Sequence, residues 1–149
     1  MEFHSSTFVL LICLVLLSSN VLHRTIWTDI DYMDGYRDFT WDPVKFNQDD
    51  MKKFADQLHD DGQHYVVIVD PGIKVEDGYE PFEQGLEMDV FIKDQQGKPF
   101  VGKVWPGFTA FPDFLHPNTS DYWSSMFAKF LNEVPIDGIW IDMNEASNM

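Results

Sequence analysis

Basic residues are scarce in this chain. Its 149 residues include 10 Lys and Arg against 25 Asp and Glu, and the formal net charge is −15. This balance argues against a nucleic-acid-binding protein, because neutralising phosphates requires a basic surface. His59, His64 and His116 lie at a helix end, a strand start and a loop without ligand spacing, so we expect surface or packing roles for them and no metal site.

Cysteine and long apolar runs are nearly absent as well. The only cysteine, Cys13, lies in the one long uncharged stretch, residues 7–22, so we expect no disulfide in the mature chain. The apolar part, residues 8–17, has the length of a signal-peptide core and is short for a membrane span, although no Lys or Arg precedes it. We therefore expect residues 1–22 to be a signal peptide. An uncleaved anchor and a buried helix are the alternatives.

A signal peptide would make the protein secreted or resident in the secretory pathway. Asn118 begins an Asn-Thr-Ser glycosylation sequon, which agrees with that route. Contact with a membrane is then expected only through the leader, and only if it remains uncleaved.

The rest of the chain has a globular composition, with 44% hydrophobic and 15% aromatic residues. Strand patterns at residues 25–32, 65–69 and 138–142 alternate with helix patterns at residues 49–59 and from about residue 121 to 131. Asn47 or Asp49 is expected to cap the first helix and Gly62 to end it, whereas Thr119 or Ser120 is expected to cap the second. Residues 72–103 are expected to be a long excursion with one short strand at residues 90–93. This order predicts an α/β fold with parallel strands.

Each expected strand ends in acidic residues, and parallel strands bring such ends to one edge, where α/β folds place their active sites. Asp29 and Asp31 lie toward the end of the first strand pattern, Asp70 directly follows the second, and Asp142 ends the third. On a strand, Trp140 and Asp142 would face the same side, and an aromatic ring beside a carboxylate suits a sugar.

Other roles for these acids are open on sequence grounds alone. Asp142 is also suited to capping a helix or binding loop amides. Asp29 and Asp31 are expected on one face of the first strand. There they could bind sugar hydroxyls as a pair or form a metal site, which is the weaker alternative. In the third alternative one acid is solvated and the other caps a turn. Glu145 lies too close to Asp142 in sequence to straddle a substrate with it, so we expect Glu145 to hold neighbouring loops.

Five sequence blocks in order resemble glycoside hydrolase family 31, the α-glucosidase and α-xylosidase family, over residues 26–148. The blocks are WTDIDYMD with DFT (residues 27–34 and 38–40), IVDPGI (68–73), VWPG (104–107), FPDF (111–114) and DGIWIDMNE (137–145). The sequence DGYRDFT at residues 34–40 is most similar to the plant α-glucosidases. The resemblance implies a partial (β/α)8 TIM barrel over residues 26–149, covering about strands two to four.

The resemblance also implies site residues. Asp142 would be the nucleophile of a retaining hydrolase, and Asp29 would bind sugar hydroxyls. Five further residues would shape the same pocket: Ile30, Ile68, Trp105, Trp140 and Met143. The expected substrate is an oligosaccharide with terminal α-linked glucose, α-xylosides being the alternative, and no cofactor is implied because two carboxylates suffice. In a plant the implied location would be the apoplast, cell wall or vacuole.

The family's acid/base aspartate lies on a later barrel strand, beyond the residues of this sequence, and a complete barrel of this type needs about 250 residues. We therefore expect the 149-residue chain to be inactive alone, since general acid catalysis contributes roughly 10²–10⁴-fold. The rival interpretations are a secreted carbohydrate-binding protein without catalysis and a truncated product with no function of its own.

Overall fold

Three parallel strands carry the predicted acids at their ends. The computed structural model describes residues 24–148, so the expected leader at residues 1–22 lies outside the described residues. Strands β1 (Thr25–Thr28), β2 (His64–Val69) and β6 (Gly138–Ile141) pair in the order β1-β2-β6, all parallel. The central strand β2 is buried after its first residue, as its continuous apolar run predicts. The α/β class and the parallel arrangement are thus confirmed.

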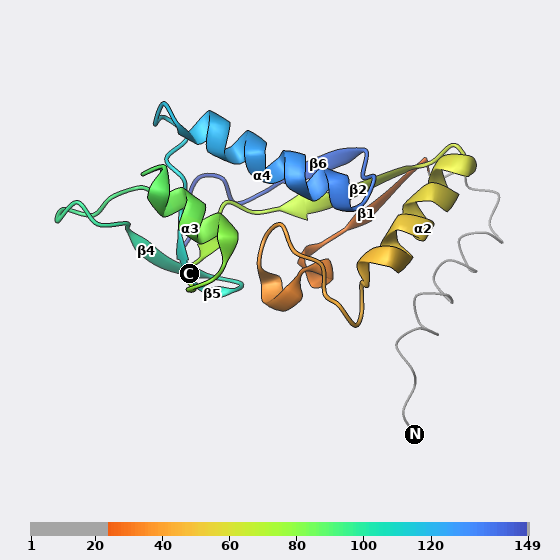
Figure 1. Ribbon diagram of the computed structural model, residues 1–149, viewed down its shortest axis with the longest axis horizontal. Coiled ribbons are helices and arrows are strands. Elements are labelled where there is room, and N and C mark those ends of the chain that lie inside the picture. The colour runs from red at the N-terminus through yellow and green to blue at the C-terminus, as the bar shows by residue number, and fades with distance from the viewer. Residues whose placement is uncertain (1–23, 149) are drawn as a thin grey trace, which may run out of the picture.

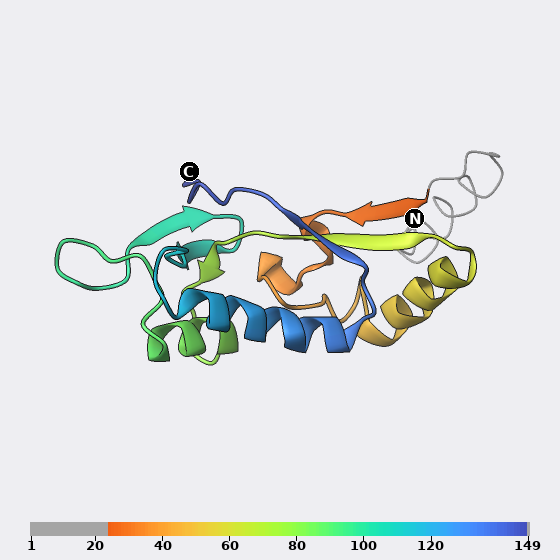
Figure 2. The same ribbon diagram turned by 90° about the horizontal axis from the view of Figure 1, so that it is seen from above.

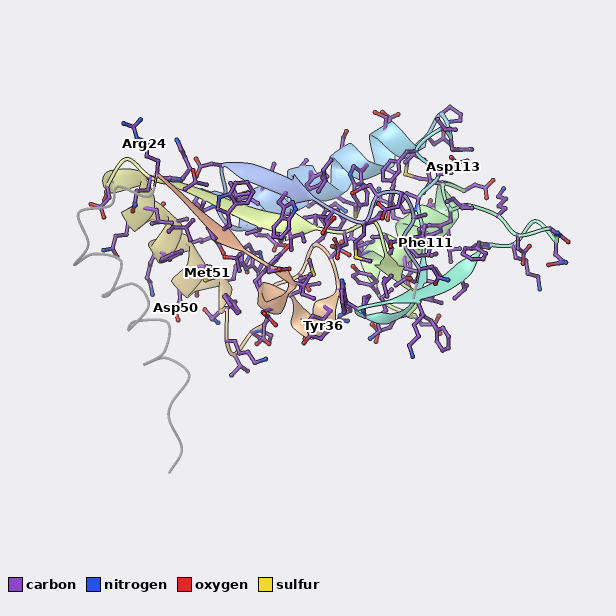
Figure 3. All side chains as sticks on the ribbon, turned by 180° about the vertical axis from the view of Figure 1, so that it is seen from behind. Arg24, Tyr36, Asp50, Met51, Phe111 and Asp113 are labelled. Atoms are coloured by element: carbon purple, nitrogen blue, oxygen red, sulfur yellow. The ribbon has the colours of Figure 1, made fainter. Side chains whose placement is uncertain are left out.

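Helices cover one side of this sheet (Figure 2). Helix α2 (Gln48–Asp60) begins where the Asn47 side chain accepts a hydrogen bond from the Asp49 N–H at 3.1 Å, and it ends before Gly62, whose φ is +69°. Its apolar stripe packs into the core, with Ala55 and Leu58 buried. Asp50 and Met51 mark its first turn in Figure 3.

Helix α4 (Thr119–Glu133) contains the helix expected at about residues 121–131. It runs along the sheet (Figure 1) and buries one face through Tyr122, Met126 and Phe130. The expected cap is wrong: the N-cap is Asn118, which makes no side-chain cap bond. Thr119 already lies in the helix, and its hydroxyl donates to the Asp113 carbonyl at 2.6 Å. The hydroxyl thus anchors the preceding loop and is not available to cap the helix.

The main core lies between the parallel sheet, α2 and α4. The Trp41 and Phe130 rings stack with centroids 5.2 Å apart, and Tyr32 is fully buried beside them. The Tyr32 hydroxyl donates to the Ile68 carbonyl at 2.7 Å, which ties the segment after β1 to the end of β2. Aromatic packing of this kind fixes the positions of the strand ends.

The segment after β1 differs from the prediction. The strand stops at Thr28, and two short 3-10 helices follow, η1 (Ile30–Tyr32) and η2 (Asp34–Tyr36). Asp29 caps η1, because its Oδ1 accepts from the Ile30 N–H at 2.7 Å, whereas Asp31 lies inside that turn. Asp29 and Asp31 therefore do not share a strand face. The local carboxylate-to-amide bond competes successfully with strand extension.

The expected excursion at residues 72–103 contains more structure than its sequence indicates. It holds β3 (Ile73–Lys74), α3 (Glu80–Glu87) and β4 (Val101–Val104), and β5 (Gly107–Ala110) follows directly. The three strands form an antiparallel sheet in the order β3-β5-β4, and residues 90–93 make only isolated bridges. Such short strands leave no readable periodicity. Figure 1 shows this sheet beyond the C-terminal ends of the parallel strands.

Within residues 24–148, no helix combines the length and the apolar character needed to cross a bilayer.

Candidate active site

A pocket with a cavity volume of about 340 Å³ lies at the C-terminal ends of the parallel strands. It brings together all seven residues that the resemblance implies, and Asp31 and Asp70 complete its lining. The full lining is Asp29, Ile30, Asp31, Ile68, Asp70, Trp105, Trp140, Asp142 and Met143. The roles of these residues stay predictions, but their shared location is a property of the fold.

Several elements supply the pocket. Asp29 follows β1, Ile68 lies near the end of β2, and Asp142 directly follows β6. Trp105 comes from the turn that joins β4 to β5, so the antiparallel sheet contributes a wall to the site. The alternation of side chains along β6 places Trp140 and Asp142 on the pocket side, whereas the neighbouring Ile141 is 63% exposed.

Asp142 is exposed and oriented by its own loop. Its Oδ1 accepts from the Met143 N–H at 2.9 Å, which is the loop-amide contact considered as an alternative role. One such bond occupies part of one carboxylate oxygen and leaves the group open to the pocket. Met143 adopts φ +58°, an uncommon conformation for a residue with a side chain. This backbone strain directly beside a pocket acid is typical of functional sites.

The aromatic walls differ in how firmly they are held. Trp140 packs edge-on against Trp27, with ring centroids 6.2 Å apart. Trp105 is 49% exposed and presents an open ring beside the acids. Exposed aromatic faces next to carboxylates match the requirements of a sugar, which offers both C–H faces and hydroxyls.

The loop after Asp142 is fastened to β4. The Asn148 Oδ1 accepts from the Lys103 N–H at 2.7 Å. A Cβ at Gly102 would approach the Phe111 ring to 2.8 Å and the Asn148 Oδ1 to 2.5 Å, so only glycine allows this approach. Figure 3 shows Phe111 beside the antiparallel sheet, far from Arg24 at the start of β1. The fastening fixes the loop next to the strand that leads to Trp105.

Asp70 in the pocket lining and Asp38 beside it are both withdrawn from solvent. Asp70 is 5% exposed, and its backbone N–H donates to the Oδ1 of Asp38, itself 1% exposed, at 2.8 Å. Burial, together with the nearby charges of Asp142 and Asp29, raises the pKa of the Asp70 carboxyl to about 6. Burial and the charge of Asp70 also raise the pKa of Asp38 well above its usual range. Like charges around one cavity thus favour a proton on its most buried member.

Asp70 is the pocket residue to which sequence reasoning gave no role. Its position at the end of a strand marked it as part of the acidic rim, but sequence alone gives no measure of burial. The rim pattern was therefore the usable signal. Within residues 24–148, no group of three or more His, Cys, Asp or Glu side chains is arranged to hold a metal ion.

Three further expectations concern Glu145, the histidines and Asn118. Glu145 is exposed and makes no hydrogen bond or ion pair with the described residues, so the expected loop-holding role is not observed. His59 and His64 lie at the surface, in agreement with the expectation, and their ring nitrogens contact the Asp137 carboxylate at 2.8 and 3.4 Å. Asn118 is exposed, and its Nδ2 donates to the Met88 carbonyl at 3.2 Å. Its glycosylation stays a prediction.

Comparison with known proteins agrees with this geometry. The family model of the glycosyl hydrolases family 31 TIM-barrel domain matches residues 16–149. An α-glucosidase from Mucor javanicus is 51% identical over 130 residues, which cover 87% of this chain and 15% of the relative. A probable α-glucosidase from Oryza sativa subsp. japonica is also 51% identical, with 84% of this chain and 14% of the relative covered.

Solved structures give the same result. A crystal structure of a glucosidase II α subunit aligns with a TM-score of 0.78 at 33% identity, over 84% of this chain and 14% of the subunit. This chain therefore spans about one seventh of the length of the relatives that it matches, 14–15% in each case. On the family-model match and these identities, the chain belongs to glycosyl hydrolase family 31.

Proposed function

We propose that this chain is the nucleophile-bearing part of a retaining α-glucosidase. The observation that supports this most strongly is the pocket itself, in which Asp142, Asp29 and the aromatic walls come together at the ends of parallel strands. In this proposal the chain supplies about barrel strands two to four. The relatives named α-glucosidase in a fungus and a plant support the choice of terminal α-linked glucose as the substrate.

Asp142 would attack the anomeric carbon and form a covalent glycosyl-enzyme, which water then hydrolyses with overall retention. Its exposure toward the cavity suits a nucleophile. Asp29 would accept hydrogen bonds from sugar hydroxyls. Ile30, Ile68 and Met143 would form the apolar floor and sides, and Trp105 and Trp140 would pack on the C–H faces of the ring.

The acid/base carboxyl is proposed to come from a later barrel strand and from none of the pocket acids described here. Asp29, Asp31, Asp70 and Asp142 all arise from one rim, whereas the acid of a retaining enzyme acts on the leaving-group side of the bond. We therefore expect maltose, whose leaving group needs a proton, to be hydrolysed far more slowly than a substrate that needs none.

α-D-Glucopyranosyl fluoride is such a substrate, because fluoride leaves without protonation. The chain is expected to be inactive on maltose because the proton donor is missing, but this substrate needs no such donor. Fluoride release by the purified chain is therefore expected to depend on Asp142 and to fall to background in Asp142→Asn. Asp56→Asn is the matched control, since Asp56 is an exposed acid on α2 away from the pocket. Fluoride release that survives in Asp142→Asn would overturn the assignment of the nucleophile.

Fluoride release, together with thermal unfolding in the presence of maltose, separates the rival functions. A carbohydrate-binding protein would be stabilised by maltose against heat and release no fluoride, and an inert product would do neither. An α-xylosyl fluoride in place of the glucosyl compound tests the alternative substrate. We expect the glucosyl compound to react faster, because the sequence Ile30-Asp31-Tyr32 resembles the α-glucosidases more than the α-xylosidases of the family.

The leader, glycosylation at Asn118 and the secretory location remain part of the proposal. A mouse lysosomal α-glucosidase among the relatives, 50% identical over 128 residues, supports the secretory pathway for this chain. Expression in a glycosylating host should add a glycan at Asn118, detected as a mass shift that Asn118→Gln removes.

A further inference from the structure

The carboxyl group of Asp70 is the feature of the pocket that the proposed mechanism leaves unused. It lines the cavity, although Asp70 is only 5% exposed to solvent. Its Oδ1 is buried and has no hydrogen-bond partner among the described residues. The group therefore reaches the cavity only through its other oxygen, Oδ2.

An ionised carboxylate is poorly accommodated at this position. A buried charged oxygen without a donor costs free energy that a neutral carboxyl avoids. The surroundings add to this cost: Asp29 follows β1, Asp142 follows β6, and Asp38 lies beneath, with its Oδ1 taken by the Asp70 N–H.

The remaining neighbours bring no positive charge. Asp31 on η1 completes the acidic lining, and no Lys, Arg or His from the described part of the chain lines the pocket. The hydroxyls of Tyr32 and Tyr79 are directed to backbone carbonyls, those of Ile68 and Asp38. Neither hydroxyl is therefore available to compensate a charge on Asp70.

We propose that Asp70 is a substrate-positioning residue that binds sugar in its protonated form, donating a hydrogen bond from Oδ2 to a sugar oxygen. This inference rests on the proposed function of the pocket. A sugar ring offers both donors and acceptors, and a carboxylate can only accept, so it satisfies the hydroxyl donors alone. A protonated Asp70 adds an O–H donor to the indole N–H groups of Trp105 and Trp140 in the pocket lining. No bond is broken in this step and the proton stays on Asp70.

Sugar affinity should then depend on pH in a way that follows the Asp70 proton. Burial and the charges of Asp142 and Asp29 put the pKa of Asp70 at about 6, so the donor form is present below that pH and lost above it. A ligand that selects the protonated form binds more weakly as the proton leaves. For methyl α-D-glucopyranoside, which does not titrate, we expect Kd to rise about tenfold or more between pH 5 and 7.5.

The experiment is a ligand-observed NMR titration of the 149-residue chain with methyl α-D-glucopyranoside at both pH values. In Asp70→Asn, whose amide cannot ionise, the pH dependence should disappear, and Asp56→Asn should retain it. Binding that is equally tight at both pH values in the unaltered chain would overturn the inference and leave the proposed function standing. Absence of binding at every pH would overturn the proposed function and the inference together.

A second measurement needs no variant. The ¹³Cγ resonance of Asp70, followed by NMR from pH 4 to 8, reports its protonation directly. Saturating methyl α-D-glucopyranoside should move the midpoint to higher pH, because the sugar binds the protonated form more tightly. A midpoint that stays in place or falls would contradict the inference, even if Asp70→Asn does not fold.

Discussion

Asp137 joins three elements at the N-terminal ends of the parallel strands, opposite the pocket. Its Oδ2 accepts from the Tyr65 N–H at 2.7 Å and lies 2.8 Å from His59 Nε2, and its Oδ1 lies 3.4 Å from His64 Nδ1. Burial acts to raise the pKa of Asp137, but the bonds from Tyr65, His59 and His64 outweigh it and lower the pKa below 3.8. The ionised form is therefore the one that holds α2, β2 and the start of β6 together.

A lowered carboxyl pKa stabilises the fold above the ordinary value, and that stabilisation is lost as pH falls through the folded-state value. We expect Asp137→Asn to lower the urea unfolding midpoint at pH 7 and to have a smaller effect near pH 2.5. Urea unfolding of both chains at the two pH values measures this. A loss of the same size at both pH values would show that Asp137 acts through shape rather than charge.

Asp70 should act in the opposite direction. Its pKa of about 6 lies above the usual 3.8, so the folded state holds the proton more tightly than the unfolded chain, and stability declines as pH rises through this window. We expect Asp70→Asn to increase the unfolding free energy at pH 8 by about 1–3 kcal/mol, with little change at pH 3. Urea unfolding of both chains at the two pH values measures this. A lower unfolding free energy of Asp70→Asn at pH 8 would contradict the conclusion that the ionised Asp70 carboxylate is unfavourable in the folded state.

At the scale of elements, long periodic segments were predictable. On α4 the residues Tyr122, Met126 and Phe130 are buried, as is every residue of β2 after the first. The cap and stop of α2 lie at Asn47 and Gly62. These features depend on contacts between near neighbours in sequence, which a single sequence displays.

The antiparallel sheet and α3 were not predictable in the same way. β3 has two residues, and β4 and β5 have four each, too few to show a period. Their pairing depends on residues far apart in sequence, such as Ile73 with Ala110. Helix α3 has only eight residues, with Gly85 in its interior, so its propensity is weak and tertiary packing decides its form.

Neighbouring residues on α4 provide a direct test of the packing. Phe130 is 1% exposed and contacts the rings of Trp41 and Tyr32, whereas Leu131 is 41% exposed. We expect Phe130→Ala to lower the unfolding free energy by about 3–5 kcal/mol, and Leu131→Ala to lower it by well under half of that. Equal losses in denaturant unfolding would mean that α4 packs through a different face.

At the scale of the whole molecule, the sequence located the pocket better than it located the elements around it. All seven implied residues line one cavity, and six of them lie at or just after the C-terminal ends of strands whose parallel order the sequence already indicated. Trp105 could be placed there only by resemblance, since it comes from the antiparallel sheet that periodicity does not reveal. The buried state of Asp70 needed the three-dimensional structure.

The described sheet has β1 and β6 at its edges, and each pairs with β2 alone within residues 24–148. Trp27 on β1 and Ile141 on β6 are 59% and 63% exposed. Edges of this kind are places where further barrel strands would pair, in agreement with the match to a TIM-barrel family over a small part of much longer relatives.

Covalent labelling of the pocket tests the nucleophile most directly. 5-Fluoro-α-D-glucopyranosyl fluoride needs no general acid to react, because its C1 fluoride leaves without protonation. The fluorine that remains at C5 slows the hydrolysis of the resulting ester. After incubation, peptide mapping by mass spectrometry should find one 5-fluoroglucosyl adduct on the chain, on Asp142, and none in Asp142→Asn. An adduct on Asp29, Asp31 or Asp70, or no adduct while the sugar demonstrably binds, would contradict the assignment of Asp142 as the nucleophile.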